Sequence, residues 1–327
     1  MDILNRVCYH VRRAKCAIDL RGLFDELRSV CIDAPIFFVG NQGGGLTLIS
    51  RMIRRHPDIV SVTGNNRYWA GADEMQRVLA WRLPRELRLS GRILRSDPSH
   101  PRFTPPRSWS YASDDLVDEY HLTEDDYTES AADQFQFLIR EALARHGRKG
   151  QASRFIDKSQ VFTLKIRYVS ALLEDATPFF VLITRNPYAA CYRAAIGKAG
   201  DMERYAEFME LDERVEVCSQ HWANTMQYAL RDGREVENFR WFRFEDILRN
   251  PQSQIKELCQ FLELDFRNDL LPAPHHELPL GSRYRNRWYP LRPDVNEKYL
   301  EEVPPYLLEK IEHRCRDVAD HFGYSRP

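Results

Sequence analysis

Five short runs of apolar residues recur along the chain, each of a length that suits a strand buried on both faces. They lie at residues 35–40, 59–63, 154–157, 178–184 and 240–244. Amphipathic helical patterns follow most of them, at residues 46–55, 161–173, 187–198 and 251–263. Because strands alternate with helices in this way, the pattern predicts an α/β fold with a central parallel sheet flanked by helices.

The alternation stops between about residues 64 and 150. Residues 82–115 are rich in Pro, Ser and Arg, and an acidic stretch from residue 121 begins a helical pattern. A long insertion in an α/β order is typical of a lid or a substrate-binding segment, and irregular surface packing is the alternative. We therefore expect a single α/β domain over residues 35–327 that carries an insertion at about 64–150.

The first 34 residues have charges throughout and apolar positions at helical spacing. This pattern lacks the apolar centre of a signal peptide and predicts an N-terminal helical segment. Docking of this helix on the domain is the simpler interpretation, and a peripheral contact with a partner or a membrane surface is the alternative.

Composition narrows the class of protein. Hydrophobic residues make up 43% of the 327-residue chain, the net charge is −1 and the mean hydropathy is −0.53. These values predict a soluble protein without a field that attracts nucleic acid. The longest apolar runs fall far short of the roughly 20 residues that a transmembrane helix needs. The seven cysteines are scattered and form no C-x-x-C pair, so we expect reduced thiols, a cytoplasmic location and no metal site.

The stretch "FFVGNQGGGLTLISRMIRR" ends a strand, turns on glycines and starts a helix. Glycine allows the backbone to approach an anion closely, and a helix N-terminus is positively polarised. We therefore expect a phosphate site formed by the amides of Gly44, Gly45, Leu46 and Thr47. The loop lacks the G-K-[ST] ending of nucleotide triphosphatases, and a mobile turn is the alternative.

Two further segments carry arginines that suit phosphate. Arg185 ends an apolar run directly before Asn-Pro, where its forked guanidinium suits a dianionic phosphate. In "GSRYRNRWYPLR", arginines alternate with aromatic residues, which suits stacking on a base and gripping phosphate. RNA binding is the alternative for this second segment, but one short basic patch on a near-neutral chain is weak evidence for it. Its arginines are Arg283, Arg285, Arg287 and Arg292.

These segments resemble the sulfotransferase family, and they occur in the family's order. The family has a loop of the form G-x-P-[RK]-S-G-T-T-L followed by a helix that ends in "HPDI". Gly40, Gly45, Thr47, Leu48 and residues 56–59 match that pattern. The resemblance implies the P-loop-like sulfotransferase fold and a loop that holds the 5′-phosphosulfate of the donor 3′-phosphoadenosine-5′-phosphosulfate, PAPS.

The loop also departs from the family's pattern. Gly43 stands where the family has its basic residue, Gly44 where it often has Ser, and Leu46 replaces the first Thr. Lys158 matches the lysine of the family's "E-K-S" segment, which lies near the transferred sulfonyl group. We therefore expect Lys158 to supply the charge that Gly43 lacks.

The resemblance extends to the segment around Arg185. The family's "R-[DN]-P" arginine and a serine eight residues later hold the donor's 3′-phosphate, and this chain has Arg193 in place of the serine. We expect Arg193 to bind the same phosphate. Glu245 and Asp246 lie in a segment that resembles the family's "Y-E-D-L" piece, and they are expected to orient a turn. The C-terminal arginine segment, including Arg283, Arg285 and Arg287, is expected to close over the nucleotide.

The resemblance implies transfer of a sulfonyl group from PAPS to a hydroxyl acceptor, which we expect to be a small molecule or a glycan such as a carbohydrate or glycolipid. Asp73 and Glu74 are the candidate bases, Glu74 being preferred, since a dry environment raises a carboxyl pKa. His56 and His221 are expected to be structural. The alternatives are a sulfotransferase-fold protein that binds nucleotide without turnover, suggested by Gly43 and Leu46, and a small-molecule kinase, whose loop should carry G-K-[ST].

Overall fold

The computed structural model describes residues 11, 27, 29–64, 73–89, 109–147, 153–199, 202–207, 209–272 and 291–327. Its strands form one parallel sheet in the order β2-β3-β1-β4-β5. They are β1 (Ile36–Val39), β2 (Ile59–Val60), β3 (Arg154–Asp157), β4 (Phe179–Thr184) and β5 (Asn238–Arg243). All five overlap the predicted apolar runs, β5 beginning two residues earlier than its run, so the predicted parallel sheet is confirmed.

The predicted helices are present as well. The helices are α2 (Leu46–Ile53), α3 (Met75–Val78), α4 (Val117–Tyr120), α5 (Glu129–His146), α6 (Ile166–Leu172), α7 (Pro187–Arg193), α8 (Leu211–Asp232), α9 (Phe244–Arg249), α10 (Pro251–Phe261), α11 (Glu297–Glu302) and α12 (Pro305–His321). The pattern at 161–173 divides into a 3-10 turn at Gln160–Leu164 and α6, and α7 continues into a π-helical turn at Ala194–Lys198.

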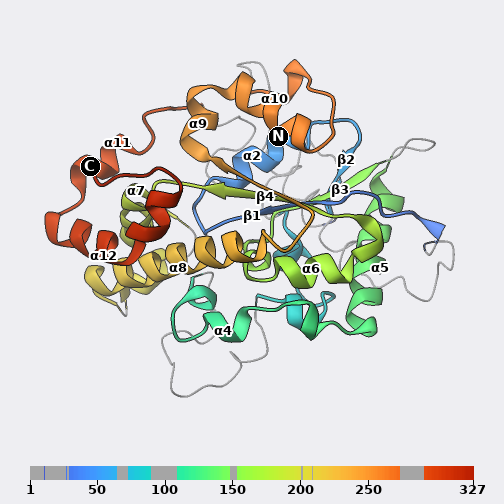
Figure 1. The fold of residues 1–327 in the computed structure, drawn as a ribbon, viewed down its shortest axis with the longest axis horizontal. Coiled ribbons are helices and arrows are strands. Elements are labelled where there is room, and N and C mark those ends of the chain that lie inside the picture. Colours follow the sequence, from blue (N-terminus) through green and yellow to red (C-terminus); the bar gives the residue numbers. More distant parts are fainter. Residues whose placement is uncertain are drawn as a thin grey trace.

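Side chains of the central strands alternate between two apolar cores. Ile36 and Phe38 face the core formed with α2, α9 and α10, whereas Phe37 and Val39 face the larger core formed with α5, α6, α7, α8 and α12. Figure 1 shows these two groups of helices on opposite faces of the sheet. Because both faces are covered, the strands read as continuous apolar runs.

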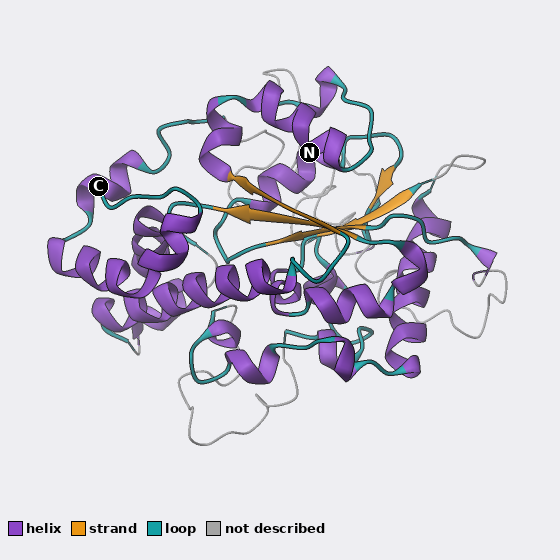
Figure 2. Ribbon diagram, in the orientation of Figure 1, coloured by secondary structure: helices purple, strands orange, loops and turns teal. Residues whose placement is uncertain are grey.

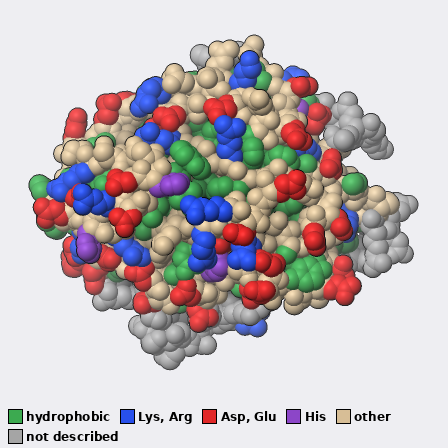
Figure 3. Space-filling view, in the orientation of Figure 1, with side chains coloured by type: hydrophobic (Ala, Val, Ile, Leu, Met, Phe, Trp, Pro, Cys, Tyr) green, Lys and Arg blue, Asp and Glu red, His purple; other side chains and the backbone are tan. Residues whose placement is uncertain are grey.

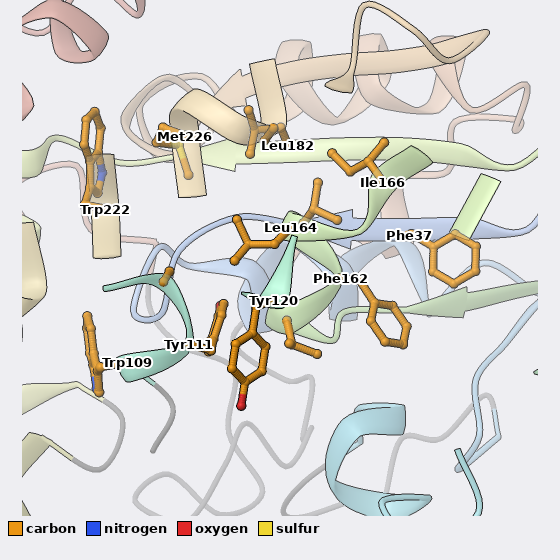
Figure 4. Packing of buried hydrophobic residues seen from close by; sticks show 14 of the residues in the cluster. Phe37, Trp109, Tyr111, Tyr120, Phe162, Leu164, Ile166, Leu182, Trp222 and Met226 are labelled. Carbon is orange, nitrogen blue, oxygen red and sulfur yellow. The ribbon is translucent and has the colours of Figure 1, made fainter. Parts of the chain in front are cut away.

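The 22-residue helix α8 runs along one face of the sheet (Figure 2). It begins with a capping box between Glu210 and Glu213, and it is about 33 Å long at 1.5 Å per residue. Its buried side chains include Trp222 and Met226, which face β4 in the larger core (Figure 4). The apolar runs alone did not predict α8 as a separate element.

The described parts of the insertion pack on the same core as α8. Trp109, Tyr111, Tyr120 and Phe135 are all fully buried there, and Figure 4 shows Tyr120 close to Leu164 of the 3-10 turn that precedes α6. The helical pattern predicted from residue 121 is confirmed by α5, whose N-terminus is capped by the Thr128 hydroxyl. This part of the insertion is therefore a packed layer of the domain.

Several predictions lie outside the described residues. They concern the helix over most of residues 1–34 and the segment with Arg283, Arg285 and Arg287. Over the part of the chain that is described, no helix combines the length and the apolar character needed to cross a membrane. Figure 3 shows basic and acidic side chains interspersed on the face in view, in keeping with the net charge of −1.

Candidate active site

The glycine loop connects the carboxyl end of β1 to α2. Gly45 precedes the helix with φ of 97°, and a Cβ at this position would lie 2.3 Å from the Phe244 ring. Glycine is therefore required at 45 both by conformation and by space. Among the described residues, the N–H groups of Gly45, Leu46 and Thr47 have no acceptor. The three amides at the start of α2 are the expected anion donors.

One expected donor is used differently. The Gly44 amide donates to the carbonyl of Asn41 at 3.1 Å, so it closes the turn of the loop. We expected this amide to converge on the ligand, and the tightness of the turn is the reason it does not. A second amide of the loop, that of Gln42, donates to Nε2 of His221 at 3.2 Å. The loop is thus held by one hydrogen bond within itself and by a second one to α8.

Arg185 follows β4 and reaches the loop from the neighbouring strand. Its Nη1 donates to the Gly43 carbonyl at 3.2 Å, while Nε and Nη2 donate to Oδ1 of Asn296 at 2.9 and 2.7 Å. Its guanidinium carbon lies 5.1 Å from the centroid of the Phe244 ring, the same ring that contacts Gly45. Arg185 is therefore held in place against the loop, and its binding of a phosphate stays a prediction.

A chain of hydrogen bonds continues from Arg185 through Asn296 to Glu245 and Tyr324. Asn296 donates to Oε1 of Glu245 at 2.5 Å, and the Asn186 amide donates to the same oxygen at 2.9 Å. The Tyr324 hydroxyl donates to Oε2 of Glu245 at 2.8 Å. Glu245 thus orients the turn after β4, which agrees with the structural role expected for it.

Arg193, at the end of α7, also lies beside Gly43. Its Nη1 is 3.6 Å from the position that a Cβ at residue 43 would take. Burial, and then the charge of Arg193, lower the pKa of Arg185 to about 10, with the more distant Glu245 acting in the opposite direction. Within the described residues, neither guanidinium has a carboxylate at ion-pair distance. Two like charges beside an anion loop are the arrangement expected for a phosphate site.

A second charged group lies beside α2. The Lys158 ammonium donates to Oε2 of Glu74 at 2.8 Å and lies 2.9 Å from Oδ1 of Asp73. Asp73 Oδ2 accepts from Nε of Arg51 at 2.9 Å and from Nη1 of Arg54. All five side chains are nearly buried. We call these residues, Arg51, Arg54, Asp73, Glu74 and Lys158, the charge cluster.

The charge cluster adjoins the loop through α2. Helical side chains lean toward the N-terminus of their helix, so Arg51 extends over the turn that contains Thr47. The carboxylates are held from the other side by the end of β3. The Met75 amide donates to Asp157 at 2.8 Å and the Gln76 amide donates to the Ser159 hydroxyl at 3.0 Å. The structure therefore brings together Lys158, Asp73 and Glu74, which the sequence had indicated only as separate candidates.

The electrostatics distinguish the two candidate bases. Burial would raise the pKa of Asp73, but Arg51, Lys158 and Arg54 together hold that pKa well below its ordinary value. This direction is opposite to the one expected from a dry environment, because three cations converge on one carboxylate. Burial likewise acts to lower the pKa of Lys158, and the charges of Asp73 and Glu74 overcome it and raise that pKa. Asp73 is therefore a fixed anion, unsuited to taking a proton near neutral pH.

The two histidines lie where the sequence placed them. His56 is buried in the "HPDI" turn, where its Nδ1 accepts from the Asp58 amide at 3.3 Å, and burial lowers its pKa. His221 is fully buried in the middle of α8. Sequence reasoning missed the contact of His221 with Gln42 and the partners of Arg185 in the C-terminal region. Arg54 was also missed, although its position three residues after Arg51 puts both on one face of α2.

Comparison with known proteins gives a consistent picture. The sequence model described as the Sulfotransferase family matches residues 35–268, which is more than half of the chain and includes the loop, Lys158, Arg185 and Glu245. Among curated proteins, none matches the chain at a significant level.

Solved structures share the fold at low sequence identity. They include the sulfotransferase domain from the curacin biosynthetic pathway, with TM-score 0.53, 17% identity, and coverage of 90% of this chain and 99% of that one. The sulfotransferase domain of the Synechococcus PCC 7002 olefin synthase gives TM-score 0.52 and 18% identity, covering 90% and 96%. Sulfotransferase STF9 from Mycobacterium avium gives TM-score 0.52 and 12% identity, covering 94% and 81%. With the family match over residues 35–268, the chain belongs to the sulfotransferase family.

Proposed function

We propose that this protein transfers a sulfonyl group from PAPS to a hydroxyl acceptor. The observation that carries the proposal is the pair of guanidiniums, Arg185 and Arg193, beside Gly43 without a carboxylate at ion-pair distance in the described residues. Arg185 is buried and Arg193 partly buried, and holding like charges close together is unfavourable unless an anion compensates them. A 3′-phosphate is a dianion of suitable charge, and ATP has no such group.

The donor is proposed to lie across the loop. Arg185 has two N–H groups left after its bonds to Gly43 and Asn296, and these are available to the 3′-phosphate together with Arg193. The amides at the start of α2 and the Thr47 hydroxyl hold the 5′-phosphosulfate. Arg193 also places a cation beside the loop, close to the basic position that Gly43 leaves empty.

Lys158 and Glu74 are proposed to serve the reaction. The acceptor oxygen attacks sulfur, and the bond from sulfur to the bridging phosphate oxygen breaks. Lys158 stabilises the charge that builds on that oxygen, and Glu74 takes the proton from the acceptor hydroxyl. Asp73, whose pKa is held low, keeps Arg51, Arg54 and Lys158 in place and is not the base. For the acceptor we propose a carbohydrate or glycolipid, on the aromatic and arginine content of the insertion.

Calorimetric titration with adenosine 3′,5′-bisphosphate, with ATP as the control, tests the donor assignment. Micromolar binding of the bisphosphate and little binding of ATP is the expected result. Turnover with labelled PAPS and a panel of hydroxyl acceptors then tests the transfer. Bisphosphate binding without turnover of any acceptor would favour a nucleotide-binding protein that lacks catalysis. Binding of ATP with magnesium in preference to the bisphosphate would favour a kinase.

A further inference from the structure

His221 connects two segments that are far apart in the sequence. Its Nε2 accepts the Gln42 amide of the glycine loop at 3.2 Å. Its Nδ1 lies 2.8 Å from the carbonyl of Trp109, which precedes the 3-10 turn Ser110–Ala112 of the insertion. The next residue, Trp222, donates from Nε1 to the carbonyl of Arg185 at 2.9 Å. Two consecutive residues of α8 therefore support both halves of the proposed donor site.

The partners of His221 determine its protonation. A carbonyl can only accept and an amide N–H can only donate, so Nδ1 carries the proton and Nε2 presents a lone pair. A second proton, on Nε2, would face the Gln42 N–H and break the contact with the loop. Burial agrees with this assignment, since it lowers the pKa of His221 to about 4.

Aromatic packing fixes the orientation of the ring. The His221 ring centroid lies 4.9 Å from that of Trp109 and 5.0 Å from that of Tyr111, which meets it edge to face. Figure 4 shows Trp109 and Tyr111 together at the turn of the insertion. The ring cannot tilt away from Gln42 without displacing these buried aromatic side chains.

We infer that His221 is a positioning residue of the donor site, whose neutral ring holds the glycine loop in its phosphate-binding shape and makes that shape depend on the turn at Trp109. The inference rests on the proposed function for its link to PAPS, although the positioning of the loop can be measured without any ligand. In the described contacts, the His221 side chain touches none of the residues proposed to bind PAPS and none of the charge cluster.

Two substitutions separate the two hydrogen bonds. In His221→Asn the shorter amide reaches the position of Nδ1 and keeps the bond to Trp109, but it cannot reach Gln42. In His221→Gln the longer amide reaches the position of Nε2, so its oxygen can accept from Gln42. Thr225→Val is the matched control, because the Thr225 hydroxyl is fully buried one turn further along α8 and bonds only to carbonyls of its own helix, those of His221 and Trp222.

The first measurement is calorimetric affinity for adenosine 3′,5′-bisphosphate. We expect His221→Asn to weaken it by about tenfold or more, as for a loop amide released from its acceptor. His221→Gln should stay within about threefold of the unmodified protein, and Thr225→Val should leave the affinity unchanged. Equal affinities of the Asn and Gln variants, or a loss in Thr225→Val as large as in His221→Asn, would overturn the inference.

The second measurement uses no nucleotide. Hydrogen exchange of a peptide that contains Gln42 should be faster in His221→Asn than in Thr225→Val or His221→Gln. If the unmodified protein fails to bind the bisphosphate while this exchange pattern holds, the proposed function fails and the positioning role stands. If His221→Asn does not fold, ¹⁵N-histidine spectra of the unmodified protein, assigned with His221→Gln, replace it. They should show the Nδ1–H tautomer at neutral pH, and an Nε2–H tautomer or a charged ring would refute the inference.

Discussion

The Arg193 guanidinium lies directly beside Gly43. The Arg193 Nη1 lies 3.6 Å from where a Cβ at residue 43 would stand, and the φ of Gly43 is 79°. A side chain at 43 would be strained by its backbone and would also meet Ala199 at 3.0 Å. The backbone and Ala199 therefore disfavour a basic residue at 43, while Arg193 of α7 places a cation beside that position.

Arg193→Ser should weaken binding of adenosine 3′,5′-bisphosphate by about tenfold, the loss expected for a charged hydrogen-bond donor. Arg193→Lys should recover part of the affinity, since it restores the charge without the fork. Isothermal calorimetry measures both. Arg316→Ser, on the exposed side of α12, serves as the control. An affinity of Arg193→Ser equal to that of this control would exclude Arg193 from the site.

Arg185→Ala should have a larger effect than Arg193→Ser, and we expect more than tenfold weaker binding of the bisphosphate. Arg185 holds the Gly43 carbonyl as well as the proposed phosphate, so its loss also loosens the loop. Calorimetry against Arg249→Ala, a surface arginine of α9 paired with Asp246, checks this expectation. Unchanged affinity would remove the 3′-phosphate assignment.

Lys158→Met should reduce turnover far more than it reduces affinity for the bisphosphate, because its proposed role is in the transition state. The measurement is kcat beside the calorimetric Kd. Lys165→Met is a matched control, since Lys165 is also buried but donates to the Tyr120 carbonyl, outside the charge cluster. Parallel losses in kcat and affinity for Lys158→Met would make Lys158 a binding residue only.

Asp73→Asn should destabilise the fold by about 3–5 kcal/mol, because Arg51, Arg54 and Lys158 would lose their shared buried anion. Among these three cations, Glu74 pairs only with Lys158 in the described contacts. Glu74→Gln should therefore destabilise the fold less than Asp73→Asn does, and it should reduce turnover more. Urea unfolding gives the two free energies, and the PAPS assay gives the turnover. A larger stability loss in Glu74→Gln would reverse the roles assigned to these carboxylates.

The pH dependence of stability should reveal His221. Its pKa is lowered to about 4 in the folded protein, whereas an unfolded histidine titrates near 6.5. The unfolded chain therefore binds more protons between these values, and the His221 contribution is complete above pH 6.5 and falls by about 3 kcal/mol as the pH drops to 4.

Asp157 acts in the opposite direction over part of this range, because burial raises its pKa to about 6. The comparison must therefore be made between proteins that share Asp157. The free energy of unfolding of His221→Gln should fall less than that of the unmodified protein between pH 6.5 and 4. Identical slopes for the two proteins would mean that His221 is not buried as a neutral ring.

The sequence predicted the sheet well because its strands are buried on both faces and thus form unbroken apolar runs. It named Lys158, Asp73 and Glu74 as separate candidates, and the structure brings them into contact because β2 and β3, which precede them, are neighbours in the sheet. The sequence could not predict that the pKa of Asp73 is lowered, because this direction depends on how many cations reach the carboxylate in the folded protein.

The role of His221 was also beyond the sequence, for a different reason. Its two partners are a backbone amide and a backbone carbonyl. Nearly every residue carries both groups, so the residue type does not show which of them will be a partner. The same is true of the Gly44 amide, which closes the loop instead of facing a ligand. The choice of main-chain partners was therefore not predictable from the sequence.

The support of Arg185 by Asn296, Glu245 and Tyr324 makes the position of this arginine depend on a residue far from it in the sequence. Tyr324 is separated from Arg185 by just two side chains. Tyr324→Phe would remove the hydroxyl donor of Glu245 and keep the aromatic ring. One missing hydroxyl would then loosen the turn after β4 without altering any residue of the glycine loop.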